Sequence, residues 1–141
     1  MYARIDLLKT NYYCNKLDWK LIENPNPVEL NIIYQDYCRH KKFSSVMPIF
    51  DSEYTDQSTD VIGYYHDENL VAFSLIKKYD SVNIEAVQFA WNYKNPKLRL
   101  GITSLENECA IYKSKGYRYL YLGSADSYKS KIQGFEILGP L

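Results

Sequence analysis

The chain has 141 residues, of which 46% are hydrophobic and 24% are charged, so it is long enough for one domain with a buried core. Its 17 basic and 17 acidic residues cancel to a formal net charge of zero. No apolar run approaches the roughly 18 residues of a membrane span, and the charged N-terminus lacks the apolar stretch of a signal peptide. We therefore expect a cytoplasmic protein without membrane contact.

The first 24 residues carry weak strand signals, at Ala3–Leu8 and at Trp19–Ile22. Three cysteines, Cys14, Cys38 and Cys109, stand far apart, and no CxxC or Cys/His cluster occurs. This pattern indicates neither a metal site nor a disulfide framework. We expect three small, buried, apolar side chains in a reducing compartment.

The turn sequence NPNP at 24–27 precedes a predicted helix from Val28 to about Lys41, with Asn26 as its cap and Pro27 in its first turn. Apolar residues at helical spacing give it one buried face. The helix ends in the basic run RHKK at 39–42. These charges complement the helix dipole, and alternatively they contact a polyanion.

Residues 43–60 are predicted to form a loop. From Asp51 to Glu68 there are six acidic residues and no Lys or Arg. We expect this acidic segment to face away from any nucleic acid that the chain binds.

Residues 61–93 are predicted to form a meander of three antiparallel strands, at Val61–His66, Leu70–Tyr79 and Val82–Tyr93. The second and third strands are rich in β-branched and aromatic residues, which is typical of central strands.

An amphipathic helix is predicted after Gly101, with Thr103 or Ser104 as its cap and Gly116 at its C-terminal end. The strand YRYLYL at 117–122 follows directly. A helix between two strands favours a parallel crossover, so this strand is expected to pair with the third meander strand. Phe135–Leu138 is expected to add a last short strand.

Positive charge concentrates in this part of the chain. Residues 94–131 contain eight basic and three acidic residues, a net charge of +5. A helix start preceded by Lys97 and Arg99 favours phosphate binding, although a solvated basic face explains the same pattern.

The order of strands and helices resembles the GNAT fold of acyltransferases, an α/β (α+β) fold with a mixed central sheet and flanking helices in a single domain, here 1–141. In that fold the acyl donor enters between the strand before the crossover helix and the strand after it. Backbone N–H groups at the helix start usually bind its pyrophosphate, in the pattern R/Q-x-x-G-x-G/A. Here the loop is RLGIT at 99–103, with one glycine and no second small residue.

A closer resemblance, over about residues 28–141, is to the C-terminal domain of arginyl-tRNA–protein transferases, a GNAT-like family that uses aminoacyl-tRNA. ELNIIYQDYCRHK at 29–41 resembles the family's E-L-Y-x-x-Y-x-x-x-R-H, and Tyr54 follows at a similar spacing. LRLGITSL at 98–105 resembles its L-S-L-G-T/V-Y-S-x-L, YLYLG at 119–123 its Y-Y-Y-L-G-Y, and SYKSK at 127–131 its M-x-Y-K. The family's cysteine-rich N-terminal region has no counterpart, and the segment between Gly123 and Tyr128 is shorter.

The resemblance implies an aminoacyltransferase that moves an amino acid from aminoacyl-tRNA to an amine of a protein, peptide or small molecule, by direct attack on the activated ester and without a cofactor. Such a site holds the tRNA 3′ end, removes a proton from the amine and stabilises an oxyanion. Our catalytic candidates are Gln88, Asp126, Tyr128 and Lys129. Our candidates for tRNA or substrate binding are Arg39, His40, Trp91, Arg99, Gly101, Thr103, Tyr121 and Lys131.

For a base or orienting group, the strand offers both Glu85 and Gln88. Their odd spacing predicts that they lie on opposite faces of the sheet, with Glu85 toward solvent. For Trp91 and Tyr121, packing is the simpler interpretation.

Two other functions stay open. The first is a GNAT acyltransferase that uses acetyl-CoA or another acyl-CoA, and the second is a non-catalytic binding protein of the same fold. A second copy of the chain, in a homodimer, is a further candidate partner.

Overall fold

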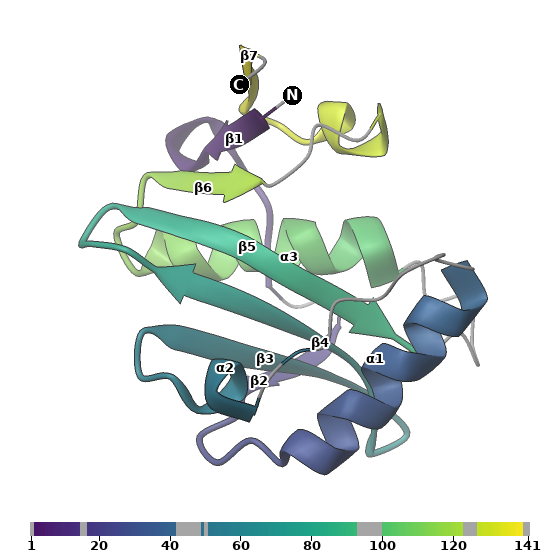
Figure 1. Ribbon diagram of the computed structural model, residues 1–141. Helices are drawn as coiled ribbons and strands as arrows, with labels where there is room; N and C mark the ends of the chain where they lie inside the picture. Colours follow the sequence, from purple (N-terminus) through teal and green to yellow (C-terminus); the bar gives the residue numbers. More distant parts are fainter. Residues whose placement is uncertain are drawn as a thin grey trace.

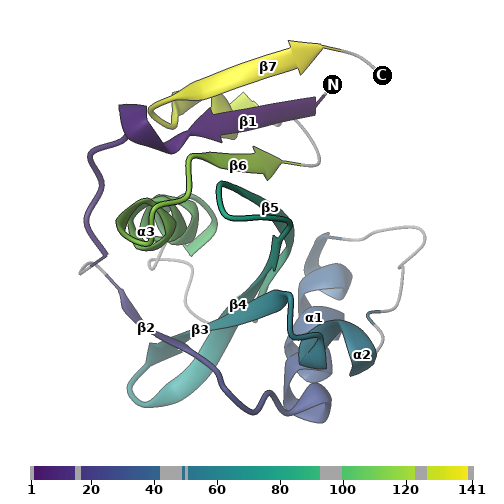
Figure 2. The ribbon, with the colours of Figure 1, turned by 90° about the vertical axis from the view of Figure 1, so that its left-hand side faces the viewer.

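The computed structural model describes residues 2–14, 17–41, 49, 51–92, 100–122 and 127–139. Its strands form one mixed sheet in the order β2-β3-β4-β5-β6-β1-β7, with helices on both faces (Figures 1 and 2). This architecture confirms the predicted fold class. None of the helices in the described ranges has the length and apolar content needed to cross a bilayer.

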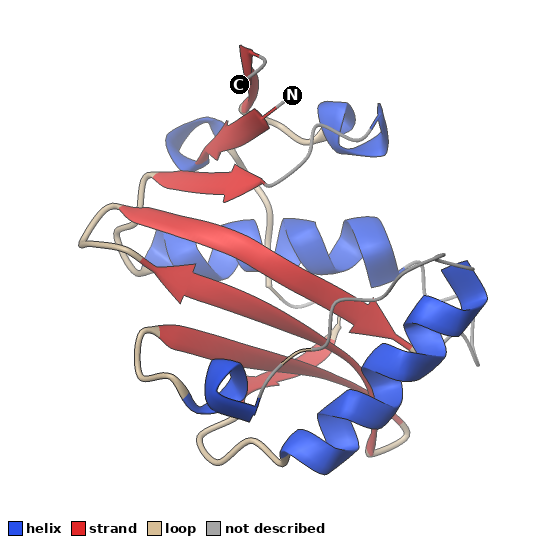
Figure 3. Ribbon diagram, viewed as in Figure 1, coloured by secondary structure: helices blue, strands red, loops and turns tan. Residues whose placement is uncertain are grey.

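Figure 3 shows the strands in red as one sheet between helices in blue. The strands are β1 (Tyr2–Asp6), β2 (Asp18–Leu21), β3 (Thr59–His66), β4 (Asn69–Lys78), β5 (Asn83–Trp91), β6 (Tyr119–Leu122) and β7 (Phe135–Gly139). The α-helices are α1 (Pro27–Lys41), α2 (Asp51–Thr55) and α3 (Leu100–Ser114). Two short 3₁₀ helices are η1 (Leu7–Lys9) and η3 (Ser127–Lys131).

The predicted meander and crossover are both confirmed. Strands β3, β4 and β5 pair antiparallel, and α3 returns the chain so that β6 lies parallel to β5. The turn after α3 uses Gly116 at φ +94°, a left-handed conformation that glycine adopts without a steric penalty.

The two ends of the chain meet in the sheet, because β1 lies between β6 and β7 and is antiparallel to both (Figure 2). Gly134 sets the approach to β7. It has φ +76°, its carbonyl accepts a bond from the Asp6 N–H at 2.9 Å, and a Cβ there would overlap the Asp6 carbonyl. Only glycine fits this position without a shift of β1.

Each face of the sheet has its own core. On the α3 face, Leu105, Cys109 and Tyr112 pack on residues that include Ile76 and Ile84. On the α1 face, α1 and α2 bury Leu30, Ile33, Tyr34 and Tyr54 against Phe73 and Leu75. The same sheet therefore presents two differently covered surfaces, as the edge-on view of Figure 2 shows.

Three local predictions are wrong. The expected loop at 43–60 contains the one-turn helix α2, which buries Tyr54. Helix α3 begins at Leu100, so Gly101, Thr103 and Ser104 lie inside its first turns instead of preceding or capping it. Cys14 is exposed, whereas Cys38 and Cys109 are buried as expected.

Replacing Asn26 by alanine is expected to lower the free energy of unfolding by about 1 kcal/mol. The Asn26 Oδ1 accepts bonds from the backbone N–H groups of Val28 at 3.1 Å and Glu29 at 3.5 Å, which satisfies two donors at the start of α1. Urea unfolding of Asn26→Ala beside Asn24→Ala measures the effect. An equal loss in both variants would contradict the capping role.

Candidate functional site

The candidate site begins where β5 loses one of its two partners. Strand β5 pairs with β6 only from Asn83 to Ala86, while its pairing with β4 continues to Trp91. Among the described residues, no strand bonds to the other side of β5 from Val87 to Trp91. We call this side of Val87–Trp91 the open edge of β5.

A β-bulge lies at the start of the open edge. The pairing of β5 with β4 shifts at Val87, so that Gln88 lies opposite Leu75 and Glu85 lies opposite Lys77. Because Leu75 and Lys77 are two residues apart, their partners share a face. Glu85 and Gln88 therefore lie together on the α1 face. The prediction that they lie on opposite faces is wrong. It assumed that side chains alternate regularly along β5, whereas the bulge inserts Val87 as an extra residue between them.

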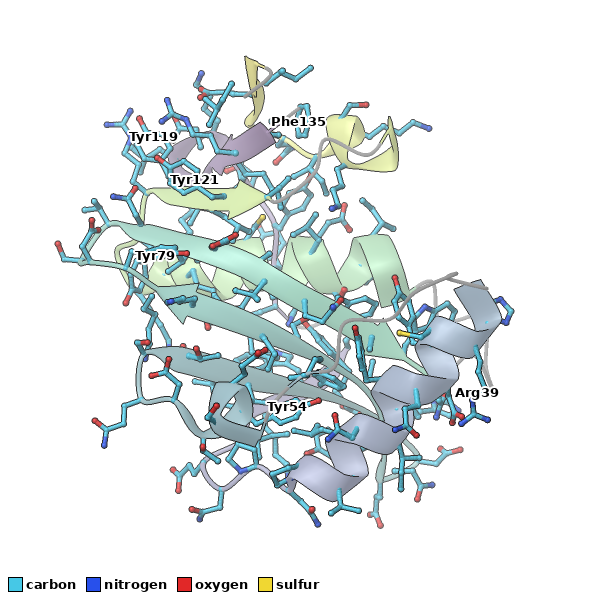
Figure 4. The ribbon with its side chains drawn as sticks, viewed as in Figure 1. Arg39, Tyr54, Tyr79, Tyr119, Tyr121 and Phe135 are labelled. Atoms are coloured by element: carbon cyan, nitrogen blue, oxygen red, sulfur yellow. The ribbon has the colours of Figure 1, made fainter. Side chains whose placement is uncertain are left out.

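The Glu85 carboxylate is held in place by a neighbouring phenol. Its Oε1 accepts a hydrogen bond from the Tyr79 hydroxyl, and the Lys77 Nζ lies 5.4 Å from the centroid of the Tyr79 ring. This bond to Glu85 raises the pKa of Tyr79, so the phenol stays protonated and continues to donate. Figure 4 shows Tyr79 beside the start of β5, with Tyr119 and Tyr121 on β6 above it.

The side chain of Gln88 accepts a hydrogen bond from a backbone N–H next to the bulge. Its Oε1 accepts a bond from the Phe89 N–H at 3.1 Å. The side chain of Gln88 thus satisfies a donor on the stretch of β5 that has lost β6. A ligand carbonyl that displaced this side chain would find the N–H already oriented.

Several predicted binding residues gather at one end of the sheet. The C-terminal end of α1, the first turn of α3, the end of β5 and η3 all lie toward the right in Figure 1. These elements carry Arg39, His40, Gly101, Thr103, Lys129 and Lys131.

This end of the molecule carries exposed basic side chains. Arg39 is exposed and pairs with Asp36 at 3.3 Å, and Lys131 is exposed. In the part of the chain that the structure describes, no atom lies within 4 Å of the position that a Cβ on Gly101 would take. The arrangement suits an anionic ligand near a helix start.

Trp91 is the last residue of β5, at this same end of the sheet, and Tyr121 lies on β6. Trp91 is half-buried and packs against the core on the α3 face. Tyr121 is on the α1 face of β6, where its ring lies 6.4 Å from that of Tyr119 and its hydroxyl accepts from the Arg4 Nη1 at 3.4 Å. Arg99 and Asp126 lie outside the described residues, and Tyr128 belongs to η3.

Glu108 is a buried acid on α3. It is 3% exposed, and its Oε2 accepts bonds from the hydroxyls of Tyr64 and, at 2.7 Å, Ser74. Burial raises the pKa of Glu108 to about 7, against the opposing effect of these two bonds. The position was detectable, since Glu108 lies three residues after Leu105 and beside Cys109 on the apolar stripe. In the described ranges, no group of three or more His, Cys, Asp or Glu side chains is arranged to hold a metal ion.

Comparison with known families identifies a match over most of the chain. The sequence model of the family described as "Arginine-tRNA-protein transferase, C terminus" matches residues 26–138. A search of curated proteins found no match.

Solved structures with the same fold have low sequence identity to this chain. A GNAT family acetyltransferase from Elizabethkingia anophelis with acetyl-CoA bound is 13% identical, with a TM-score of 0.53 over 83% of this chain and 71% of that one. The ribosomal-protein-alanine N-acetyltransferase from Brucella melitensis biovar Abortus 2308 is 13% identical, with a TM-score of 0.60 over 82% and 83%. L-PGS from Bacillus licheniformis is 18% identical, with a TM-score of 0.58 over 88% of this chain and 46% of that one. These likenesses show that the fold is GNAT-like.

Proposed function

Because the chain belongs to the family of arginine-tRNA-protein transferase C-terminal domains, we propose that it transfers an amino acid from aminoacyl-tRNA to an amine acceptor. The observation that carries the proposal is the extent of the family match. Residues 26–138 include α1, β3 to β5, α3, β6 and η3, which are the elements around the open edge of β5. The whole candidate site therefore belongs to the part of the chain that the family shares.

The distribution of charge supports a position for the donor. The basic end formed by α1, α3 and η3 suits the phosphates of a tRNA 3′ end, because Lys and Arg side chains neutralise them and release counterions. Helix α3 adds the partial positive charge of its N-terminus, where no atom of the described residues crowds Gly101. The aminoacyl ester then reaches the open edge of β5.

The reaction needs one group that accepts a proton and one hydrogen-bond donor that stabilises the oxyanion. The acceptor nitrogen attacks the ester carbonyl, a C–N bond forms, and the C–O bond to the terminal ribose breaks. Glu85 takes the proton of the attacking amine and returns it to the leaving ribose oxygen. The Phe89 N–H, released by Gln88, donates to the developing oxyanion. The Tyr79 hydroxyl holds Glu85 in position.

An acyl-CoA donor is the second candidate, and one observation favours it. The Elizabethkingia anophelis protein with the same fold has acetyl-CoA bound, and here no atom of the described residues crowds Gly101 at the start of α3. A CoA user would be stabilised against heat by free CoA, with a small effect of salt. A tRNA user would bind charged tRNA with a steep dependence on salt.

The double variant Lys129→Ala, Lys131→Ala is expected to weaken tRNA binding by about tenfold at low salt. The slope of the logarithm of the binding constant against the logarithm of the salt concentration is expected to fall in magnitude by about one to two. Each lysine removed deletes a counter-charge from η3. Binding of a charged tRNA measured from 50 to 300 mM salt tests this expectation. The matched control is Lys20→Ala, an exposed lysine on β2. A parent protein whose tRNA binding does not respond to salt would contradict the proposed donor.

A further inference from the structure

Two adjoining cavities lie on the α1 face, beside α2. The smaller, of about 330 Å³, is lined by Glu53, Asp56, Thr59, Leu75, Lys77 and Val87. The larger, of about 600 Å³, shares Thr59 with it and extends along β3 to the turn after β2. We call these two the paired cavities. Both volumes fall in the range of ligand pockets.

The lining of the paired cavities is acidic. Glu53 and Asp56 line the smaller cavity, and Glu23 and Asp60 line the larger one. Lys77 is the one basic residue among the lining residues of both cavities.

One of these carboxylates is turned away from the cavities. Asp60 points to the α3 face, where it is bound by the Lys78 Nζ at 2.9 Å and by the Tyr112 hydroxyl at 2.7 Å. Glu23 and Glu53 are exposed at the rims of the cavities. The remaining charge favours a positively charged occupant.

The paired cavities lead directly to the proposed reaction centre. Val87, the bulge residue that begins the open edge of β5, lines the smaller one. Thr59, Lys77 and Glu85 are cross-strand partners in a row over β3, β4 and β5. Neighbouring strands lie about 4.8 Å apart, so Thr59 is roughly 10 Å from Glu85. An extended peptide covers that distance in about three residues.

We propose that the paired cavities bind the acceptor, and that this acceptor is a peptide whose second to fourth residues carry positive charge. The inference rests on the proposed function for the location of the attacking amine. With that amine at Glu85, the following side chains pass Lys77 and reach the carboxylates of Glu53, Asp56 and Glu23. Donor and acceptor are thereby separated by charge, with the anionic tRNA at the basic end and the cationic peptide over the acidic segment.

The test measures peptide binding in the absence of tRNA. The probes are three tripeptide amides, Ala-Lys-Lys, Ala-Gln-Gln and Ala-Glu-Glu, titrated into the ¹⁵N-labelled chain while the amide signals of Thr59, Lys77 and Val87 are followed. We expect the lysine peptide to shift these signals and to bind at least fivefold more tightly than the glutamine peptide. We expect the glutamate peptide to bind more weakly than both.

Matched variants test which acidic side chains attract the lysine peptide. The double variant Glu23→Gln, Glu53→Gln is expected to weaken binding of the lysine peptide about threefold to tenfold. Binding of the glutamine peptide is expected to stay unchanged. The control Glu68→Gln removes an exposed acid from the β3–β4 turn and is expected to change neither. Equal binding of all three peptides, no binding of any, or shifts confined to residues outside the paired cavities would overturn the inference.

A parallel transfer assay separates the two proposals. Transfer to acidic peptides in preference to basic ones would leave the proposed function standing and would overturn the acceptor assignment. Binding of the lysine peptide at the paired cavities without transfer from any tRNA would support the acceptor site and contradict the proposed function.

Discussion

Glu85→Gln is expected to lower the rate of amino-acid transfer by about 10² to 10⁴, with both substrates saturating. Glutamine keeps an oxygen that accepts the bond from the Tyr79 hydroxyl, so the local structure is preserved. What is lost is the carboxylate that takes the proton of the attacking amine. The measurement is single-turnover transfer from a charged tRNA, which reports the chemical step without product release.

Two companion variants sharpen this result. Tyr79→Phe removes the group that positions Glu85 and is expected to reduce the rate by about tenfold, with little change in tRNA binding. Glu106→Gln, on α3 and away from the open edge of β5, is expected to have no effect. A Glu85→Gln enzyme that transfers at the parent rate would show that the proton goes elsewhere.

Glu108→Gln is expected to raise the free energy of unfolding by about 3 kcal/mol at pH 8 and to change it little at pH 4. The acid is buried on α3, and its pKa is raised from 4.5 to about 7. At pH 8 the folded protein must hold a buried carboxylate, whereas the unfolded chain ionises it in water. Glutamine accepts from the same Tyr64 and Ser74 hydroxyls without that cost.

The direction with pH follows from linkage. Below about pH 4.5 the Glu108 carboxyl is protonated in both the folded and the unfolded protein, so ionisation costs the folded state no stability there. Between about 4.5 and 7 only the unfolded chain releases the proton, and stability is lost as pH rises through this window. Thermal unfolding from pH 4 to pH 8 should show the loss in the parent and not in Glu108→Gln, a difference of roughly 10 °C at pH 8. Parallel pH profiles of the two proteins would contradict the assignment.

The fold was predictable wherever the signal was local. Asn26, Pro27 and the apolar spacing after them specified α1, and a helix joined to a strand through Gly116 predicted the parallel pairing of β5 and β6. The place of β1 between β6 and β7 was not predictable, because it depends on contacts across the full length of the chain. Helix α2 is too short to show a helical period.

The candidate site was predicted only in part. The basic residues of α1 and η3 were found from charge, and the structure brings them to one end of the sheet. The bulge at Val87 has no local signature, since it arises from a mismatch between β5 and β4. That single extra residue moves Gln88 onto the same face as Glu85 and changes which side chains act together. The burial of Glu108 likewise depends on Tyr64 and Ser74, which come from strands far away in the sequence.

The measurement that tests the central claim is transfer of label to a mixed peptide pool from a panel of radiolabelled aminoacyl-tRNAs, beside labelled acetyl-CoA. We predict that label reaches peptide from at least one aminoacyl-tRNA, that acetyl-CoA gives none, and that Glu85→Gln abolishes the signal. Transfer from acetyl-CoA alone, or from neither donor, would contradict the claim that this chain is an aminoacyl-tRNA-dependent transferase.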